Sequence, residues 1–546
     1  MKIALAQLNY HIGNFESNTK KIITAIEDAK QAGAELVVFA ELAICGYPPR
    51  DFLEFSEFIE LCDNAVKEIA YACVDIACII GVPTKNPRIE GKDLFNSAYF
   101  IENGKVSQLV NKALLPTYDV FDEYRYFEPS VSFSCINFKG HKIALTICED
   151  LWNINDNPLY TSAPMDELIK ENPALMINIA ASPFSYNHDD NRYKILSDNC
   201  KKYQLPLLYV NQVGSQTEII FDGGSLVFNA QGEMLDQLNY FEEDIRIYEF
   251  NGTEITGHHI KEHNPSPDIE QIHKALLLGI KDYFYKSGFS KAVLGLSGGI
   301  DSAVVCALAA EALGPENVMA VLMPSKYSTG HSVQDALDLA NNLGCKHETI
   351  AIKAAADAFD SMLEPVFKGL PFNITEENIQ ARCRAIIVMA FSNKFGYILL
   401  NTSNKSECAV GYGTLYGDMA GAIGVLGDVY KTQVYQLANY INRDREIIPQ
   451  NSIVKPPSAE LRPDQKDSDS LPEYDVLDKL LYQYIELKKS SRDIIAQGFD
   501  EALVRKVIAM VNKAEFKRYQ TPPILRVSPK AFGMGRRMPI VGKYLS

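Results

Sequence analysis

Residues 293–303, which read VLGLSGGIDSA, have the composition of a phosphate-binding turn. Where a buried strand ends in a glycine and serine turn and a helix begins, backbone N–H groups and the positive end of the helix dipole can bind an anion without a lysine. The string fits neither G-x-x-x-x-G-K-[ST] nor G-x-G-x-x-G, and a turn without a ligand would explain two adjacent glycines equally well. The longer string SGGIDS favours a nucleotide site. We expect that site to comprise Gly295, Leu296, Ser297, Gly298, Gly299, Ile300, Asp301 and Ser302. Asp301 would help to hold a magnesium ion, the usual partner of nucleotide phosphates.

Three other residues have side chains suited to nucleophilic catalysis. Glu41 follows an apolar run in FAELAICGYPPRD, Lys112 lies in LVNKALLPTYD, and Cys148 follows the apolar run of TICED, where a turn should expose it. Taken singly, they are typical of a solvated strand end, a surface charge and a buried spacer. Taken together and in this order, they resemble the Glu-Lys-Cys triad of the nitrilase family.

That resemblance implies hydrolysis of an amide. Glu41 would act as general base on the Cys148 thiol, which would attack the amide carbon to form a thioester. Lys112, with a backbone N–H, would stabilise the oxyanion of the tetrahedral intermediates. Water would then release a carboxylate, and the amide nitrogen would leave as ammonia.

The first half of the chain must position these three residues. Residues 2–9 and 34–42 are typical of buried strands, and residues 18–34 of an amphipathic helix. Further strands are expected at 77–83, 96–112, 141–149, 174–182, 205–212 and 223–235. So many strands predict two sheets with helices outside, the α-β-β-α sandwich of a nitrilase-like domain over residues 1–250. Residues 251–268 lose this periodicity and collect Gly, His, Asn and Pro, which indicates a linker.

The second half of the chain must position the phosphate turn. Helices are expected at 269–288, 302–314 and 332–344, alternating with strands at 291–297, 318–324, 346–352 and 397–404. This alternation predicts an α/β domain over residues 269–546 with a doubly wound parallel sheet, similar to the adenine nucleotide α-hydrolase fold. Residues 450–475 are polar and contain prolines, and we expect a mobile loop there.

Composition limits the classes of function. A chain of 546 residues is too long for one ordinary core, so two or more domains are expected. The net charge of −16 disfavours nucleic-acid partners, and no apolar run approaches the roughly 18–20 residues of a membrane span. The first residues alternate apolar with polar and do not resemble a signal peptide. Eleven cysteines without a C-x-x-C pair indicate a reducing compartment. We therefore expect a cytoplasmic protein with small-molecule substrates and neither nucleic acid nor membrane as a partner.

The two halves together resemble one family. The SGGIDS loop is similar to that of ATP pyrophosphatases, and a nitrilase-like domain before it is the layout of glutamine-dependent NAD+ synthetases. The resemblance covers nearly the whole chain, including ENIQARCRAIIVMAFSN, NTSNKSECAVGYGTLYGDMAG, GDVYKTQV and FKRYQTPP. It implies that the chain takes ammonia from L-glutamine, adenylates deamido-NAD+ with ATP and Mg2+, and displaces AMP with ammonia to give NAD+. It also implies a homo-oligomer, because nitrilase domains commonly associate.

The resemblance also implies roles for individual residues. The glutamine pocket would comprise Tyr118, Glu149, Trp152, Ser182 and His188. At position 188 the family usually has a lysine or arginine. Beyond the loop, ATP would contact Thr402 and Lys431, and magnesium would bind Asp301 and Glu407. Deamido-NAD+ would contact Asn378, Arg382, Glu407 and Lys517, with Arg384 nearby.

Two other interpretations fit the same motifs. An ATP-pyrophosphatase-type amidotransferase could use another acceptor, as in GMP synthesis or tRNA modification. The acidic balance disfavours tRNA, and no Cys-His-Glu glutaminase pattern stands out in residues 1–250. A catalytically silent binding or assembly protein could also keep this fold, although it would have no need of the full triad and loop.

Overall fold

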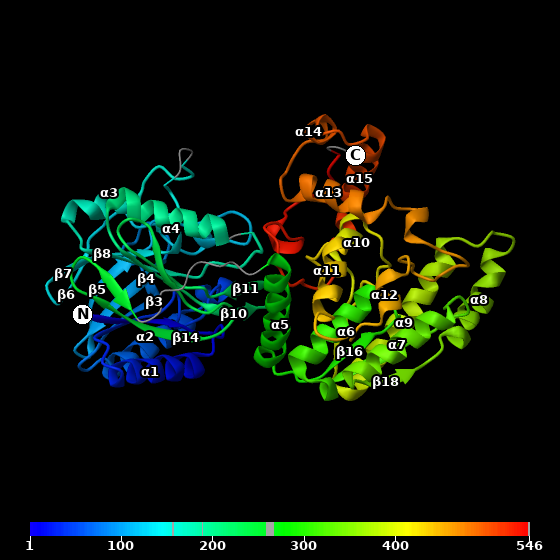
Figure 1. Cartoon of the computed structure of the whole chain (residues 1–546), viewed down its shortest axis with the longest axis horizontal. Helices are drawn as coiled ribbons and strands as arrows, with labels where there is room; N and C mark the ends of the chain where they lie inside the picture. The colour runs from blue at the N-terminus through cyan, green and yellow to red at the C-terminus, as the bar shows by residue number, and fades with distance from the viewer. Residues whose placement is uncertain (155–157, 188, 258–266, 544–546) are drawn as a thin grey trace. The chain divides into compact units, whose positions relative to one another are not determined.

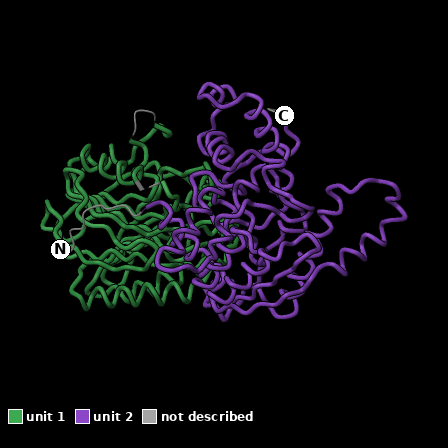
Figure 2. The backbone as a smooth tube through the Cα atoms, turned by 45° about the vertical axis from the view of Figure 1, so that its right-hand side comes forward, with its two compact units in different colours: residues 1–266 green, residues 267–546 purple. Residues whose placement is uncertain are grey.

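The computed structural model describes residues 1–154, 158–187, 189–257 and 267–543. The chain divides into two compact units, Met1–Ser266 and Pro267–Ser546 (Figure 2). Within the segment expected to be a linker, Ile255–Gly257 form strand β15, and residues 258–266 lie outside the described residues.

The first unit contains two β-sheets. The seven-stranded sheet has the order β15-β14-β1-β2-β3-β4-β5, and the six-stranded sheet has the order β13-β12-β9-β8-β7-β6. The strands of the first sheet are β1 (Lys2–Gln7), β2 (Leu36–Val38), β3 (Ala77–Lys85), β4 (Leu94–Glu102), β5 (Lys105–Asn111), β14 (Asp244–Phe250) and β15. The strands of the second are β6 (Ile136–Phe138), β7 (His141–Ile147), β8 (Leu175–Ala180), β9 (Leu207–Asn211), β12 (Leu226–Phe228) and β13 (Met234–Gln237). A separate hairpin joins β10 (Val213–Gln216) to β11 (Ile219–Asp222).

Helices cover the outer faces of both sheets, which gives the expected four-layer α-β-β-α sandwich (Figure 1). One layer contains α1 (Phe15–Gln31) and α2 (Ser56–Ala72), and the other contains α3 (Pro164–Leu168) and α4 (Asp189–Tyr203). The alternation of β1 explains the layering: Ile3 and Leu5 are buried in the core between the sheets, whereas Ala4 and Ala6 pack in the core beneath α1 and α2. Helix α2 and the β10–β11 hairpin were not predicted from the sequence.

The second unit is built on one parallel sheet. Its order is β18-β17-β16-β19-β20, and each neighbouring pair is parallel. The strands are β16 (Ala292–Gly295), β17 (Val318–Leu322), β18 (Lys346–Thr349), β19 (Ile398–Asn401) and β20 (Ile423–Gly424). The chain starts this sheet in its centre, builds one edge and then the other, so the predicted doubly wound fold is confirmed. Its switch point lies between β16 and β19, where such sheets bind ligands.

Helices complete the second unit. Those around the sheet are α5 (Asp268–Lys286), α6 (Ile300–Leu313), α7 (Gly330–Leu343), α8 (Lys353–Phe367), α9 (Ile374–Phe395), α10 (Lys405–Val410) and α11 (Lys431–Ile441). A separate apolar cluster unites α10 with α13 (Tyr474–Ile485), α14 (Ser491–Ala496) and α15 (Glu501–Lys513) (Figure 1). The prediction of a loop throughout 450–475 is wrong, because this segment contains α12 (Gln450–Val454), a 3-10 turn at Asp467–Asp469 and the first residues of α13.

None of the helices within the described ranges is long and apolar enough to cross a membrane. All eleven cysteines are free thiols and are buried.

Candidate active site

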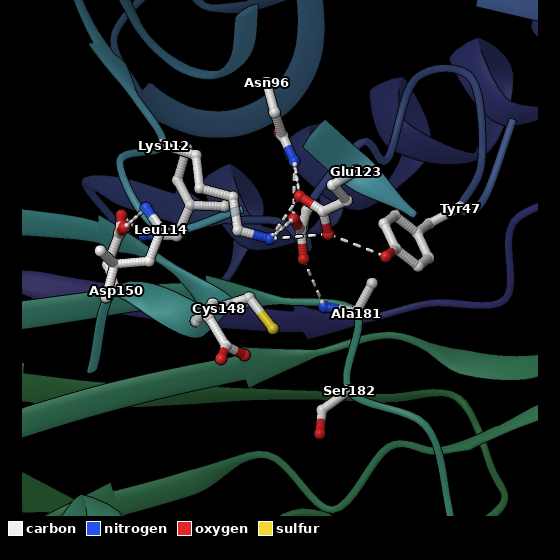
Figure 3. A network of polar contacts seen from close by, with 12 residues as sticks. Tyr47, Asn96, Lys112, Leu114, Glu123, Cys148, Asp150, Ala181 and Ser182 are labelled. Carbon is white, nitrogen blue, oxygen red and sulfur yellow. Dashed lines mark hydrogen bonds and ion pairs between the residues drawn. The ribbon is translucent and has the colours of Figure 1, made fainter. Parts of the chain in front are cut away.

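The three residues of the expected triad come together in the first unit (Figure 3). Glu41 lies three residues beyond β2, Lys112 directly follows β5, and Cys148 directly follows β7. Lys112 Nζ lies 2.7 Å from Glu41 Oε1, and both side chains are fully buried. Figure 3 shows the Cys148 sulfur directed toward the side of the network where the Lys112 ammonium lies. Strand ends from both sheets therefore bring a carboxylate, a cation and a thiol to one place.

The expectation that a turn exposes Cys148 is wrong. Cys148 is only 6% exposed, because it starts a short 3-10 helix (Cys148–Leu151) that belongs to the core between the sheets. Its φ of 42° lies in the left-handed region, which a residue other than glycine adopts at a cost of about 1–3 kcal/mol. The strand-to-helix turn thus holds the thiol in a strained and buried position.

A fourth charged residue, Glu123, completes this network. Both of its carboxylate oxygens lie 2.8 Å from Lys112 Nζ, and one also accepts a hydrogen bond from the Tyr47 hydroxyl. Sequence reasoning missed Glu123 because it stands beside Asp122 and reads as part of a solvated acidic run. The aromatic residues that surround it in TYDVFDEYRYF were the available signal of burial.

Two more contacts fix the Glu41 carboxylate. The side-chain amide of Asn96 donates a hydrogen bond of 2.7 Å to Oε1, and the backbone N–H of Ala181 donates one of 3.0 Å to Oε2. Ala181 follows strand β8, so the second sheet holds one oxygen while the first sheet supplies the donors to the other. Glu41 is therefore held in one orientation.

The charges of the network act on one another. Burial disfavours the Lys112 ammonium, but Glu123 and Glu41 outweigh burial and raise the pKa of Lys112 well above its usual range. Burial and Glu41 raise the pKa of the Cys148 thiol, while Lys112 lowers it. Burial raises the pKa of Glu123 to about 7 against the opposing effect of Lys112. The arrangement keeps a proton on the thiol at rest, beside a carboxylate that can accept it and a fixed cation that can stabilise developing negative charge.

Asp150 connects the chain segments of Lys112 and Cys148. One carboxylate oxygen accepts hydrogen bonds from the backbone N–H groups of Ala113 and Leu114 at 3.0 and 2.9 Å. The other accepts one from the backbone N–H of Ile147 at 3.0 Å. Burial raises the pKa of Asp150 to about 6. These three bonds, which we call the Asp150 clamp, fix the residues next to the cation and next to the thiol.

Of the expected glutamine-pocket residues, Tyr118 and Glu149 are in contact. The Tyr118 hydroxyl lies 3.0 Å from both carboxylate oxygens of Glu149, the residue after the thiol, and Tyr118 as a whole is 42% exposed. Trp152 is half-buried, and its backbone N–H donates to the Glu149 carbonyl. Ser182 is buried, and its backbone N–H donates to Asn211 Oδ1. His188 lies outside the described residues.

The phosphate turn of the second unit borders a cavity of about 320 Å³. The turn joins β16 to α6, whose first residue is Ile300, so the helix N-terminus points at this cavity. The cavity is lined by Gly295, Leu296, Ser297, Gly299, Ile300, Asp301, Ser302, Arg384, Thr402, Glu407 and Lys431, among others. Gly298 is the expected member of the turn that does not line it. Its φ is 82°, and a Cβ there would lie 2.0 Å from the carbonyl oxygen of Ser332, so only glycine fits.

Asp301, Glu407 and Lys431 form a charged cluster at the rim of this turn. Lys431 Nζ pairs with Asp301 Oδ2 and lies 3.6 Å from Glu407 Oε1. Burial and Asp301 raise the pKa of Glu407 to about 8, and Lys431 opposes them. Within the described residues no group of three or more metal-ligating side chains occurs. A site for Mg2+ beside a nucleotide needs only one or two carboxylates, because the phosphates supply further ligands. Asp301 and Glu407, which already attract the Lys431 ammonium, fit this requirement.

The other residues expected to contact the dinucleotide surround the segment 411–415. Asn378 Oδ1 accepts from the Thr414 hydroxyl at 2.7 Å, and Arg382 Nε donates to the Leu415 carbonyl at 3.2 Å. Lys517 Nζ donates to the carbonyls of Gly411 and Gly413 at 2.8 and 2.7 Å. These three residues do not line the cavity, but Tyr412, within the segment they hold, does.

Comparison with known proteins decides the family. Residues 2–256 match the carbon-nitrogen hydrolase family, and residues 272–521 match the NAD synthase family. The chain is 47% identical to a glutamine-dependent NAD+ synthetase of Synechocystis sp. over 98% of both chains, and 42% identical to one of Acinetobacter baylyi over 99% and 98%. The chain belongs to the glutamine-dependent NAD+ synthetase family.

The resemblance found in the sequence is thereby confirmed, and with it the ligase class of enzyme. A solved glutamine-dependent NAD+ synthetase of Acinetobacter baumannii, in complex with adenosine diphosphate, superimposes on this chain with a TM-score of 0.79 at 39% identity, covering 100% of this chain and 99% of that one. The similarity to members of the glutamine-dependent NAD+ synthetase family thus extends over both units of the chain.

Proposed function

We propose that this enzyme makes NAD+ from deamido-NAD+, ATP and L-glutamine through two reactions in two units. The first unit hydrolyses glutamine to glutamate and ammonia. The second adenylates deamido-NAD+ and amidates it with that ammonia. The family to which the chain belongs and the chemistry of the two sites support this proposal.

The glutaminase reaction follows from the network around Lys112. Glu41 takes the Cys148 proton as the sulfur attacks the amide carbon of glutamine, and Lys112 stabilises the resulting oxyanion. Glu41 then gives the proton to the departing nitrogen, so that ammonia leaves and a thioester remains. Glu41 next takes a proton from water, which attacks the thioester, and the thiolate regains a proton as glutamate leaves. Glu123 does not touch the substrate in this scheme but fixes the Lys112 ammonium.

Glutamine binding is assigned to residues beside the nucleophile. Glu149, held by the Tyr118 hydroxyl, is a buried anion suited to the α-ammonium of the substrate. Trp152, Ser182 and His188 complete the proposed pocket. The partial exposure of Tyr118 supports a pocket that is reached from solvent on that side.

The synthetase reaction is assigned to the phosphate turn and its cavity. Residues 295–302, Thr402 and Lys431 would hold ATP, and Asn378, Arg382, Glu407 and Lys517 would hold deamido-NAD+. The nicotinate carboxylate attacks the α-phosphorus of ATP, so that pyrophosphate leaves and an acyl adenylate forms; ammonia then attacks the acyl carbon and AMP leaves. Asp301 and Glu407 would hold Mg2+, which neutralises phosphate charge when it is bound. The N–H groups at the start of α6 and the Lys431 ammonium orient the phosphates.

The single observation that carries the proposal is the Lys112 ammonium, held at 2.7 Å by Glu41 and at 2.8 Å by Glu123 beside a buried thiol. Burying one cation and two anions carries a large desolvation penalty. A role in catalysis explains why the chain keeps this arrangement, whereas a catalytically silent protein would not need it. The acceptor is tested by measuring AMP and pyrophosphate release with ATP, Mg2+ and ammonium while deamido-NAD+ is added or omitted. Release that depends on deamido-NAD+ supports the proposal, whereas release that depends on another carboxylate or carbonyl acceptor contradicts it.

A homo-oligomeric assembly and a cytoplasmic location stay predictions of the sequence.

A further inference from the structure

The carboxylate of Glu149 receives hydrogen bonds from two phenols. One is Tyr118, which the sequence already indicated. The other is Tyr160, whose hydroxyl lies 3.0 Å from Glu149 Oε1. Glu149 is only 4% exposed, so these donors take the place of water around a buried charge.

Asn153 fixes the position of Tyr160. The Asn153 side-chain amide donates to the carbonyls of Tyr160 and Ser162 at 2.9 and 2.7 Å, and the backbone N–H of Tyr160 donates to Asn153 Oδ1 at 3.1 Å. Asn153 uses both its donor and its acceptor groups in this way, which defines the backbone of Tyr160 on both sides of its Cα. Asn153 therefore fixes the chain segment that carries Tyr160, and this segment holds the Tyr160 hydroxyl in contact with Glu149.

The two phenols influence the charge of Glu149. Burial raises the pKa of Glu149, and Glu41 raises it further. Lys112 and the hydroxyls of Tyr118 and Tyr160 lower it. Each phenol therefore favours the anionic form of a carboxylate that adjoins the nucleophile along the chain.

We propose that Tyr160, positioned by Asn153, is a specificity-determining residue that keeps Glu149 anionic and correctly oriented for the α-ammonium of the amide substrate. This inference rests on the proposed glutaminase function. It follows that the first unit selects amides carrying a cationic amino group, because an amide without one leaves the buried Glu149 anion unpaired. Tyr160 would act through Glu149 and would not touch the scissile amide.

The test compares two amides in the full-length enzyme. Glutamine is one substrate, and glutaramate, which is glutamine with hydrogen in place of the α-ammonium, is the other. The Tyr160→Phe variant removes only the phenolic oxygen, and Asn153→Ala releases Tyr160 while leaving its hydroxyl. Tyr203→Phe is the matched control, because its hydroxyl contacts Asp166 on an exposed part of the same unit.

For both test variants we expect the ratio of kcat/KM for glutamine to that for glutaramate to fall roughly tenfold, the size typical of losing one hydrogen bond to a charged group. The loss should appear in KM for glutamine. The acid limb of the glutamine profile should also move to higher pH, because the pKa of Glu149 rises when a donor is removed. Tyr203→Phe should retain the wild-type ratio.

Equal losses with both amides, or no change in the ratio for either test variant, would overturn this inference while leaving the proposed function intact. A wild-type enzyme that hydrolyses neither amide would instead contradict the proposed function itself.

Discussion

Lys112 Nζ lies 2.8 Å from both carboxylate oxygens of Glu123, a residue that no sequence motif had marked. The same ammonium is 2.7 Å from Glu41, so one buried cation is shared between two buried anions. Because Glu41 must accept a proton during the reaction, the second carboxylate leaves Lys112 with a partner throughout the cycle. The expected effect of replacing Glu123 depends on this sharing of the Lys112 ammonium.

Replacing Glu123 with Gln should impair glutamine hydrolysis without affecting the second unit. The amide keeps the shape of the side chain but removes one of the two charges that hold Lys112, which is typically worth about 1.5–3 kcal/mol, or roughly 10- to 100-fold in kcat. Rates of NAD+ formation with glutamine and with ammonium check this. A loss of equal size with both nitrogen sources would show that Glu123 serves general stability instead.

The Asp150 clamp should be needed for glutaminase activity. In Asp150→Asn one oxygen can still accept from Ala113 and Leu114, but the amide nitrogen would face the Ile147 N–H, and two donors cannot bond to each other. We expect a loss of roughly tenfold or more in glutamine-dependent rate, with the ammonium-dependent rate retained. An unaltered glutamine-dependent rate would exclude a positioning role for the clamp.

The same carboxyl group predicts a pH effect. Since burial raises the pKa of Asp150 from 3.8 to about 6, the folded enzyme binds a proton in this window that the unfolded chain releases. The contribution of Asp150 to the free energy of unfolding is therefore present below pH 3.8 and is lost as the pH rises through about 6. Glutamine hydrolysis should instead be lost as the pH falls through about 6, because a protonated Asp150 has one acceptor fewer for the backbone N–H groups of the clamp. Asp150 should contribute the part of the acid limb of glutamine hydrolysis that lies near pH 6, beside any contribution of Glu149. This part should weaken in Asp150→Asn, and an unchanged limb would show that Asp150 does not contribute to it.

Part of this organisation could be predicted from the sequence. The phosphate turn and both sheet arrangements follow from local patterns, because strand ends and glycine turns are encoded within a few residues. The triad was singled out by its resemblance to that of the nitrilase family, because each of its residues taken alone has an ordinary structural explanation. Asn96 and Asp150 could not be singled out, since they act through partners 36 to 55 positions away, and Glu123 reads as part of a solvated acidic run. Asn96, for example, binds a carboxylate 55 positions away. The burial of Cys148 was missed because a strand end was expected to open into an exposed turn, whereas the short helix that starts at Cys148 packs against α3 and α4.

Gly298 should tolerate no side chain. In Gly298→Ala the added Cβ would lie 2.0 Å from the Ser332 carbonyl oxygen, and the backbone would hold a φ of 82°, at a cost of about 1–3 kcal/mol for the backbone alone. We expect a lower thermal midpoint for the second unit and weaker ATP binding. Gly288→Ala is the matched control, because its φ is 74° but nothing lies within 4 Å of the new Cβ. Equal effects of the two variants would show that backbone strain, rather than the contact with Ser332, makes glycine necessary.

Asp301 should be required for synthesis with either nitrogen source. Asp301→Ala removes the partner of Lys431 and one of the two carboxylates assigned to Mg2+. NAD+ formation should fall by 100-fold or more, roughly 3 kcal/mol in the activation free energy, whereas some glutamine hydrolysis should remain. Loss of hydrolysis to the same extent as synthesis would contradict the assignment of Asp301 to the second reaction alone.

The most direct test of two separate reactions is the Cys148→Ala variant, assayed with deamido-NAD+, ATP and Mg2+. We predict that NAD+ formation from glutamine is abolished, because the thiol forms the thioester, while formation from ammonium stays close to that of the wild-type enzyme. If the folded variant loses both activities together, or keeps the activity with glutamine, the central claim is wrong.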